Sequence, residues 1–274
     1  MFKIALSAGH GLNTSGKRCP EYLDPNETRE WVLNSRICNK IEQKLTAYDG
    51  YKLIRLDDVT GKTDVALKTR TNNANKFGAD FYLSIHHNAG VGGRSGGGII
   101  AIVYLRVDNV TKDWQSALYN AVIKHTGLRG NRSQPLQSQD LHEVRESKMP
   151  AVLLECGFMD SSTDNPIILT DEYADKVATA CVEVLVAKGG LTKKKTTVAP
   201  TVTPTVTAPS KSYFAKYNGT SGSIVTALKA IGVDSSYTYR AKIAVANGIN
   251  GYRGTADQNI YMLGLLKKGT LVKP

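Results

Sequence analysis

A stretch rich in proline and threonine divides the chain into two parts of unequal length. Residues 191–210 read LTKKKTTVAPTVTPTVTAPS, without an aromatic residue and without apolar periodicity. A segment of this composition cannot bury a hydrophobic core, and its prolines favour an extended, semi-rigid conformation. We therefore expect a large N-terminal domain at residues 1–190, a linker at residues 191–211 and a small module at residues 212–274.

Positive charge is concentrated at the C-terminal end. The formal net charge of the 274 residues is +11, and residues 211–274 hold nine Lys and Arg against two Asp. A field of this sign attracts polyanions such as nucleic acid, acidic lipid or anionic wall polymers. Residues 1–188 are nearly neutral, which argues against a nucleic-acid partner. Because no apolar run approaches the ~20 residues of a membrane span, we expect no membrane insertion.

Short apolar runs alternate with amphipathic segments in the N-terminal domain. Buried strands are expected at residues 2–8, 51–56, 80–86, 98–105 and 151–157. Apolar residues at helical spacing predict helices at residues 30–48, 64–77, 112–125 and 171–188, the second capped by Thr63 or Asp64. This alternation predicts an α/β fold in which a mostly parallel, twisted sheet is flanked by helices on both faces.

The C-terminal module has a different pattern. Residues 223–231, 239–246 and 256–267 predict three short helices, so this module should be small and mainly α-helical. A module this short buries little surface and is expected to be only marginally stable. Its expected core consists of apolar residues on these helices: Ile224, Leu228, Ile243, Leu263 and Leu266.

Two histidines and one glutamate stand where α/β folds place their chemistry. His10 follows the first expected strand and His86 ends the third, so both lie at carboxyl ends of strands. Glu155 lies inside the apolar run LLECG, where an unpaired carboxylate carries a large desolvation cost. The alternative for Glu155 is a structural salt bridge in the core, for example with Arg70.

A long polar loop at residues 11–28 supplies further acids. A loop of this length between a strand and a helix is uncommon unless it is functional. Two imidazoles and one carboxylate make an open tetrahedral Zn²⁺ site, and Glu27 is the candidate carboxylate beside His10 and His86. Glu21 and Asp24 compete for this role, and Glu27 is equally suited to be a first-turn helix acid.

Three other candidates have weaker claims to the site. His87 replaces His86 if the strand shifts by one residue, but strand alternation points His87 to the opposite face. His142 and Glu143 fit either a cleft or the surface. Cys156 follows Glu155 but has no evident base, so a thiol nucleophile is not expected.

Together these residues resemble one known family. GHG after the first strand, a Glu before the first helix, the pattern L-x-x-R-x-x-x-A-N (Leu67–Asn75), SIHHNA (Ser84–Ala89) and PAVLLECGFM (Pro150–Met159) look like the zinc-dependent N-acetylmuramoyl-L-alanine amidases of the amidase-3 type. The resemblance implies one Zn²⁺ held by His10, Glu27 and His86, with Glu155 as the catalytic carboxylate. It also implies hydrolysis, by zinc-activated water, of the amide between the lactyl group of muramic acid and L-alanine in peptidoglycan.

The C-terminal module is similar to wall-binding repeats of hydrolases from Gram-positive bacteria and their phages. This similarity implies that an anionic wall glycopolymer is its partner, with basic residues pairing with phosphates. Aromatic residues would either stack on sugars or pack in the core. They are Tyr213, Phe214, Tyr217, Tyr237, Tyr239 and Tyr252.

The expected protein is a modular lytic enzyme of the phage or prophage endolysin kind. MFKIALSAGHG does not have the form of a signal peptide, so we expect synthesis in the cytoplasm and action on the wall after holin-type release or host-cell lysis. A lysis enzyme of a spore-forming mother cell is a second possible origin. The alternatives are a zinc carboxypeptidase acting on peptidoglycan stem peptides, which the lack of H-x-x-E at His10 disfavours, and a non-enzymatic wall polyanion-binding protein.

Overall fold

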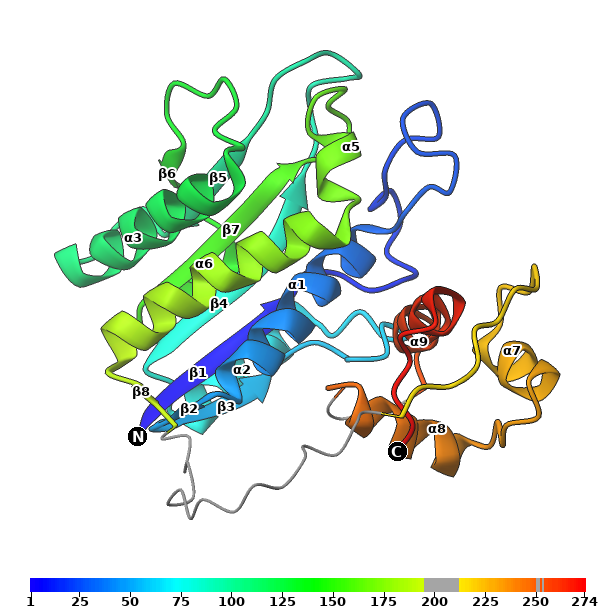
Figure 1. The fold of residues 1–274 in the computed structure, drawn as a ribbon. Coiled ribbons are helices and arrows are strands. Elements are labelled where there is room, and N and C mark those ends of the chain that lie inside the picture. Colours follow the sequence, from blue (N-terminus) through cyan, green and yellow to red (C-terminus); the bar gives the residue numbers. More distant parts are fainter. Residues whose placement is uncertain (195–211, 250–251, 253) are drawn as a thin grey trace. The chain divides into compact units, whose positions relative to one another are not determined.

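The computed structural model describes residues 1–194, 212–249, 252 and 254–274, and it separates into two compact units, Met1–Thr196 and Thr197–Pro274 (Figure 1). Most of the linker expected at residues 191–211 lies outside the described residues. Its first residues belong to the first unit: Leu191 is buried, and β8 (Thr192–Lys193) pairs with β2 (Tyr48–Asp49). A buried leucine followed by a strand pair explains why the first unit extends past residue 190.

A six-stranded sheet forms the centre of the first unit, in the order β3-β1-β4-β7-β5-β6. Strands β3, β1, β4 and β7 are parallel to one another. Strand β5 runs antiparallel to β7 and parallel to β6. The expected mostly parallel α/β architecture is therefore confirmed. The strands are β1 (Phe2–Ala8), β3 (Tyr51–Arg55), β4 (Phe81–Asn88), β5 (Ile99–Val103), β6 (Leu136–Ser138) and β7 (Ala151–Phe158).

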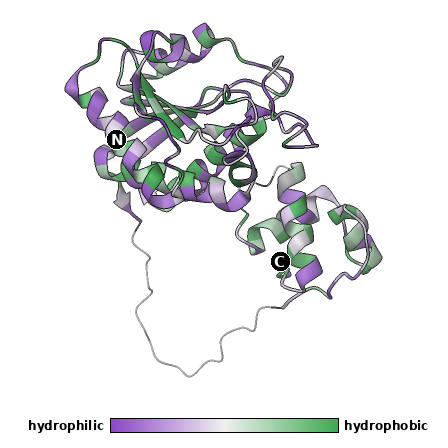
Figure 2. Cartoon of the chain, turned by 90° about the horizontal axis from the view of Figure 1, so that it is seen from above, coloured by the Kyte–Doolittle hydropathy of each residue, from purple (hydrophilic) through white to green (hydrophobic). Residues whose placement is uncertain are grey.

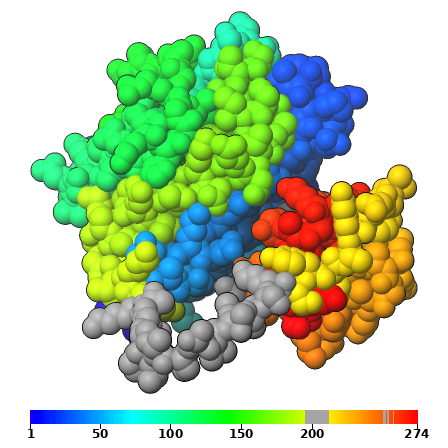
Figure 3. Space-filling view, in the orientation of Figure 1, coloured from blue at the N-terminus to red at the C-terminus, as the bar shows by residue number. Residues whose placement is uncertain are grey.

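Helices cover both faces of this sheet. On one face, α1 (Glu30–Leu45), α3 (Asn109–Thr126) and α6 (Asp171–Gly189) pack against strand residues such as Leu83 and Leu154. In the space-filling view of this face they cover most of the strands (Figure 3). On the other face, α2 (Leu67–Phe77) and α4 (His142–Arg145) contribute Ala74 and Val144 to a second apolar cluster. Figure 2 shows hydrophobic residues gathered on the strands between these layers.

Strand alternation determines which side chains meet each helical layer. On β4, Leu83 and Ile85 contact the layer of α1, α3 and α6, whereas Tyr82 faces α2 and α4. His86 lies on the same side as Tyr82, and Glu155 of β7 is its cross-strand partner. The sheet therefore presents both residues toward α2 and α4. A short helix, α5 (Asn165–Ile168), connects β7 to α6.

The start of α2 differs from the expectation. The helix begins at Leu67 with Ala66 as its N-cap, so neither Thr63 nor Asp64 caps it. The Asp64 carboxylate instead accepts hydrogen bonds from the Thr14 hydroxyl (2.7 Å) and from Arg70 (3.2 Å). Asp64 thus ties the loop after β1 to α2.

The second unit contains α7 (Ile224–Ala230), α8 (Tyr237–Ala246) and α9 (Ala256–Lys268). The five residues expected to form its core are all buried. Two of the six aromatic candidates for sugar stacking, Phe214 and Tyr252, belong to this core, whereas Tyr213 and Tyr237 are about half exposed. Across the described parts of both units, no helix combines the length and the apolar character needed to cross a membrane.

Candidate metal centre

His10 lies directly beyond the carboxyl end of β1, in a constrained backbone conformation. Its φ of 66° falls in the left-handed region, which non-glycine residues rarely occupy. Two contacts hold the segment: the Gly9 N–H donates to the Ile85 carbonyl (2.9 Å), and Arg70 donates to the His10 carbonyl (3.1 Å). The fully buried Arg70 thereby fixes the direction in which the His10 imidazole points.

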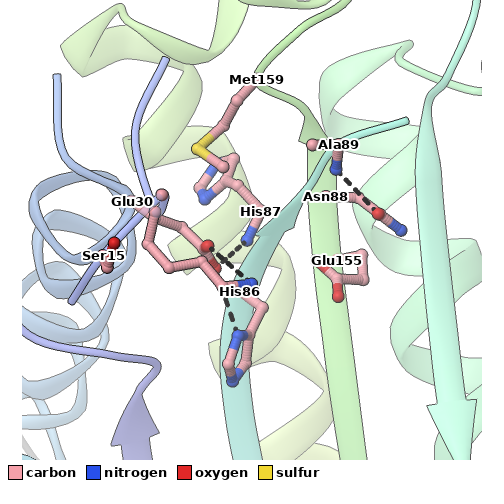
Figure 4. Close-up of a pocket in the computed structure, with 10 residues that line it drawn as sticks. Ser15, Glu30, His86, His87, Asn88, Ala89, Glu155 and Met159 are labelled. Atoms are coloured by element: carbon pink, nitrogen blue, oxygen red, sulfur yellow. Dashed lines mark hydrogen bonds and ion pairs between the residues drawn. The ribbon is translucent and has the colours of Figure 1, made fainter. Parts of the chain in front are cut away.

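His86 and Glu155 stand side by side at the same edge of the sheet. They are register partners on the parallel strands β4 and β7, so their side chains project from the same face (Figure 4). Both line a pocket with a volume of about 290 Å³. The sequence predicts that both residues belong to strands, and the strand register brings their side chains next to each other.

Glu30 supplies the carboxylate that lies between the two histidines. It is the first residue of α1, and its side chain is 1% exposed. Its Oε1 lies 3.2 Å from Nδ1 of His86, and its Oε2 lies 3.3 Å from Nε2 of His10. The three ligand atoms lie within 4.8 Å of one another, a spacing that permits a shared metal ion.

The structure does not place Glu27 in this cluster. Glu27 has a φ of 47° and a partly exposed carboxylate that pairs with Nε of Arg18 at 3.0 Å. Of the competing acids, Glu21 is exposed, and Asp24 accepts hydrogen bonds from the backbone N–H groups of Asn26 and Thr28. The acid beside the histidines is thus Glu30, three residues beyond Glu27.

The sequence carries a signal for Glu30. The predicted first helix itself begins with Glu30. A carboxylate in the first helical turn is stabilised by the helix dipole, and the start of a helix that follows a parallel strand lies near the carboxyl edge of the sheet. Asn34, one turn later, donates to Glu30 Oε1 (3.3 Å) and to the Gly9 carbonyl (3.1 Å), and so connects α1 to the end of β1.

Neighbouring charges set the protonation of this cluster. Burial by itself would raise the pKa of Glu30, but His10 and His86 outweigh it and hold that pKa well below its usual value. Burial likewise opposes charge on His86, yet the carboxylates of Glu143 and Glu30 raise its pKa to about 10. Burial raises the pKa of Glu155 to about 7, into the range suited to proton transfer near neutral pH.

The donor set fits a zinc ion. Two imidazole nitrogens and one carboxylate oxygen are the ligands of an open tetrahedral zinc site, which leaves a fourth position for a water or substrate. Oε2 of Glu30 is buried and has no hydrogen bond of normal geometry; its nearest cationic neighbours are Nε2 of His10 at 3.3 Å and Nζ of Lys17 at 3.7 Å. Because a buried carboxylate oxygen without a hydrogen bond is costly, this atom has the environment expected of a metal ligand.

Glu155 Oε2 is also buried, again without a donor among the residues that the structure describes. The salt-bridge alternative for Glu155 does not match its surroundings, because Arg70 makes its hydrogen bonds to Ser7, Ala8, His10, Asp64 and Val65. Glu155 therefore lies beside His86 as a partly buried carboxylate facing the pocket.

The remaining histidine candidates lie apart from the three ligand atoms. His87 points to the opposite side from His86 (Figure 4), where its Nδ1 lies 2.8 Å from Oδ1 of Asn34. Burial lowers the pKa of His87 to about 3, so its ring is neutral. Nε2 of His142 lies 3.3 Å from the Thr71 hydroxyl. Glu143 is buried, contrary to the surface alternative, and contacts Nε2 of His86.

Fold and site together define an α/β protein with a His–Glu–His cluster at the carboxyl edge of a mostly parallel sheet. Comparison with known families gives a match to N-acetylmuramoyl-L-alanine amidases over residues 4–187, which is more than half of the chain. The chain belongs to this family.

Individual relatives agree with the family match. A sporulation-specific N-acetylmuramoyl-L-alanine amidase of Bacillus subtilis (strain 168) is 33% identical over 181 residues, covering 65% of this chain and 64% of that protein. The endolysin of Bacillus phage SPP1 is 30% identical over 199 residues, covering 72% and 69%. The chain thus matches less than two thirds of the length of the B. subtilis relative.

A solved structure confirms the arrangement of the first unit. The N-acetylmuramoyl-L-alanine amidase from Clostridium difficile 630 is 25% identical and superposes with a TM-score of 0.61, over 68% of this chain and 95% of that one. The second unit lies outside the residues of the family match.

Proposed function

We propose that this chain is a zinc-dependent N-acetylmuramoyl-L-alanine amidase, which hydrolyses the amide between muramic acid and L-alanine in peptidoglycan. Family membership supports the reaction class. The observation that carries the proposal is the buried Glu30 carboxylate between His10 and His86, with Glu155 beside it in the same pocket. We assign His10, Glu30 and His86 as the ligands of one Zn²⁺.

The chemistry divides between the ion and the chain. Bound Zn²⁺ supplies Lewis-acid polarisation of the scissile carbonyl and of the attacking water. Glu155 takes a proton from that water and delivers it to the amide nitrogen, so that L-alanine leaves with a free amino group. Burial raises the pKa of the Glu155 carboxyl to about 7 in the metal-free chain, and a bound cation lowers it from there, so at neutral pH Glu155 is ionised and can accept the proton.

Analysis of the cleaved termini tests this proposal. Purified peptidoglycan would be digested with the full chain, with a chelator-treated sample and with that sample after zinc is restored. We expect free L-alanine amino groups, no new reducing sugars, loss of activity with chelator and recovery with zinc. Release of D-alanine would indicate the carboxypeptidase alternative, and chelator-resistant cleavage would contradict the zinc assignment.

We also propose that the second unit binds an anionic glycopolymer of the wall. Its support is the excess of basic residues at 211–274 and the exposure of Tyr213 and Tyr237. Sedimentation with purified walls tests the proposal: the full chain should bind, and a chain ending before residue 212 should not. Walls stripped of their anionic polymer serve as the control, and equal binding to stripped walls would contradict an anionic ligand.

The similarity to a phage endolysin supports a route of action as part of the same proposal. The protein would be made inside the cell and reach the wall when the membrane is opened by a holin-type protein or by host lysis. Expression in a bacterial host with and without a membrane-permeabilising protein tests this route. Lysis in both cultures at the same rate would contradict it.

A further inference from the structure

Glu143 is a buried carboxylate that the proposed reaction does not use. It belongs to α4, and its side chain is 4% exposed. Oε1 accepts hydrogen bonds from the hydroxyls of Tyr82 and Ser7, and Oε2 accepts one from the Ser84 hydroxyl (3.0 Å). A carboxylate is buried at tolerable cost only where its lone pairs are satisfied in this way. The three surrounding hydroxyls therefore satisfy the hydrogen-bonding needs of the buried Glu143 carboxylate.

The contacts of Glu143 determine which nitrogen of His86 carries a hydrogen when a metal is bound. Glu143 Oε2 lies 3.3 Å from His86 Nε2. Because an ionised carboxylate can only accept, Nε2 must be the donor. A neutral imidazole has one protonated nitrogen, so Nδ1 keeps a lone pair. That nitrogen lies 3.2 Å from Glu30 Oε1, so the lone pair of His86 points toward the carboxylate that the two histidines share.

Arg70 balances the charge of Glu143 and connects it to the other histidine. Its Nη1 donates to Ser7 Oγ (2.7 Å), which donates to Glu143 Oε1 (3.3 Å). The same guanidinium donates to the carbonyls of Ala8 and His10. One continuous network thus runs from the backbone at His10 to the far side of the His86 ring.

We propose that Glu143 is a positioning residue of the metal centre: it holds the His86 ring so that Nδ1 binds Zn²⁺ while Nε2–H donates to the Glu143 carboxylate. This inference rests on the zinc site proposed above. Carboxylates that accept from a metal-binding histidine fix its tautomer and raise its basicity as a ligand, and their loss typically lowers metal affinity 10–100-fold.

Zinc affinity provides the first test. The full chain would be freed of metal and titrated with zinc against a chelator of known affinity, for the wild type, Glu143→Gln and Glu146→Gln. Glu146 is a matched control because it follows α4 and pairs with Arg145 at the exposed surface. We expect roughly 10-fold weaker zinc binding for Glu143→Gln, and binding within about twofold of the wild type for Glu146→Gln. Equal affinity of all three proteins would overturn the inference.

A measurement on the wild type makes the test independent of whether Glu143→Gln folds. Long-range proton–nitrogen NMR of the zinc-loaded chain identifies the protonated nitrogen of each histidine ring. We expect hydrogen on Nε2 of His86 and zinc on Nδ1. The reverse assignment would refute the role of Glu143 alone, whereas a wild type that binds no zinc would refute the proposed function itself.

Discussion

Glu30 and Glu27 lie three residues apart and have opposite environments. The Glu30 carboxylate is buried between two imidazoles, whereas the Glu27 carboxylate is partly exposed and paired with Arg18. A carboxylate at the first position of α1 also gains from the helix dipole, which stabilises negative charge there. Glu30 therefore has the environment of the proposed metal ligand, and Glu27 that of an ordinary loop acid.

Glu30→Gln should remove bound zinc, and Glu27→Gln should not. The neutral amide of Gln is a poor ligand and also places N–H donors opposite the histidines, so zinc affinity should fall beyond the 10–100-fold loss typical of outer residues. Metal content measured by elemental analysis after dialysis checks this. Zinc retained by Glu30→Gln and lost by Glu27→Gln would show that Glu27, and not Glu30, binds the metal.

Glu155→Gln should keep zinc and lose hydrolysis. The substitution preserves the size of the side chain but removes the proton acceptor, and general acid–base groups typically contribute 10²–10⁴-fold to the rate. Turnover of a soluble muramoyl-peptide and zinc content should be measured on the same sample. Activity within about twofold of the wild type would show that another group moves the proton.

The raised pKa of Glu155 sets the direction of the pH dependence. As a base, Glu155 must be ionised, so kcat/KM should fall as the pH drops through its pKa, which burial raises to about 7 in the absence of metal. A bound cation favours the ionised carboxylate and moves this acid limb below pH 7. A pH profile on a soluble substrate checks the limb. A rate that increases as the pH falls from 7 to 5 would exclude Glu155 as the base.

The backbone at the end of β1 packs directly against the His86 ring. Gly9 follows the strand, and a Cβ built on it would lie 2.2 Å from Cε1 of the His86 ring. Real atoms do not approach so closely, so any side chain at position 9 must displace that ring. The glycine in SAGHG is therefore required by the packing of His86 against the backbone of the strand end.

Gly9→Ala should weaken zinc binding by moving the His86 ring. We expect a loss of at least about 10-fold, comparable to the removal of an outer-shell partner, while the far-ultraviolet circular dichroism stays unchanged. Chelator competition measures the affinity. Unaltered affinity would mean that the strand end shifts without disturbing the ligand geometry.

Elements with a strong local pattern were predictable from the sequence. β1 and the starts of α1 and α6 match the expected bounds, because each apolar run is flanked by charged residues or a glycine. β6 and α4 were missed, since three or four residues carry too little periodicity to be recognised. Short elements of this kind owe their structure to the sheet edge or helix against which they pack.

The site was predictable where it depends on strands and less so where it depends on long-range packing. His10, His86 and Glu155 follow from strand ends and from an acid within an apolar run. Glu143 has no local signal, because its burial depends on Tyr82 and Ser84, about 60 residues away in the chain. The sequence does not single out Glu30, because the pattern does not show on which side of the helix start an acid turns inward.

The two units have separate hydrophobic cores. The clusters of the first unit contain residues up to Leu191, and the cluster of the second begins at Phe214. The proposed zinc ligands all belong to the first unit, and they come from β4, α1 and the loop after β1. A cation that binds them acts on the folded first unit and has no such site in the unfolded chain.

Zinc should therefore raise the unfolding temperature of the first unit selectively. At a free concentration 100 times the dissociation constant, a ligand that binds only the folded state adds about 2.7 kcal/mol of stability. Calorimetry of the full chain should show that zinc raises the unfolding temperature of the first unit relative to the chelator-treated sample. The unfolding temperature of the second unit should stay the same. Equal shifts of both transitions would contradict a site confined to the first unit.

The pairing of β8 with β2 determines where the chain departs from the first unit. Lys194 donates its N–H to the Ala47 carbonyl, and Gly50 accepts from Phe2 N–H at the amino end of β1. His10 follows the other end of that seven-residue strand, roughly 20 Å away. Lys194 is thus remote from the proposed zinc ligands. A fusion made after Lys194 would therefore leave those residues undisturbed, and the first unit could be joined to other binding domains.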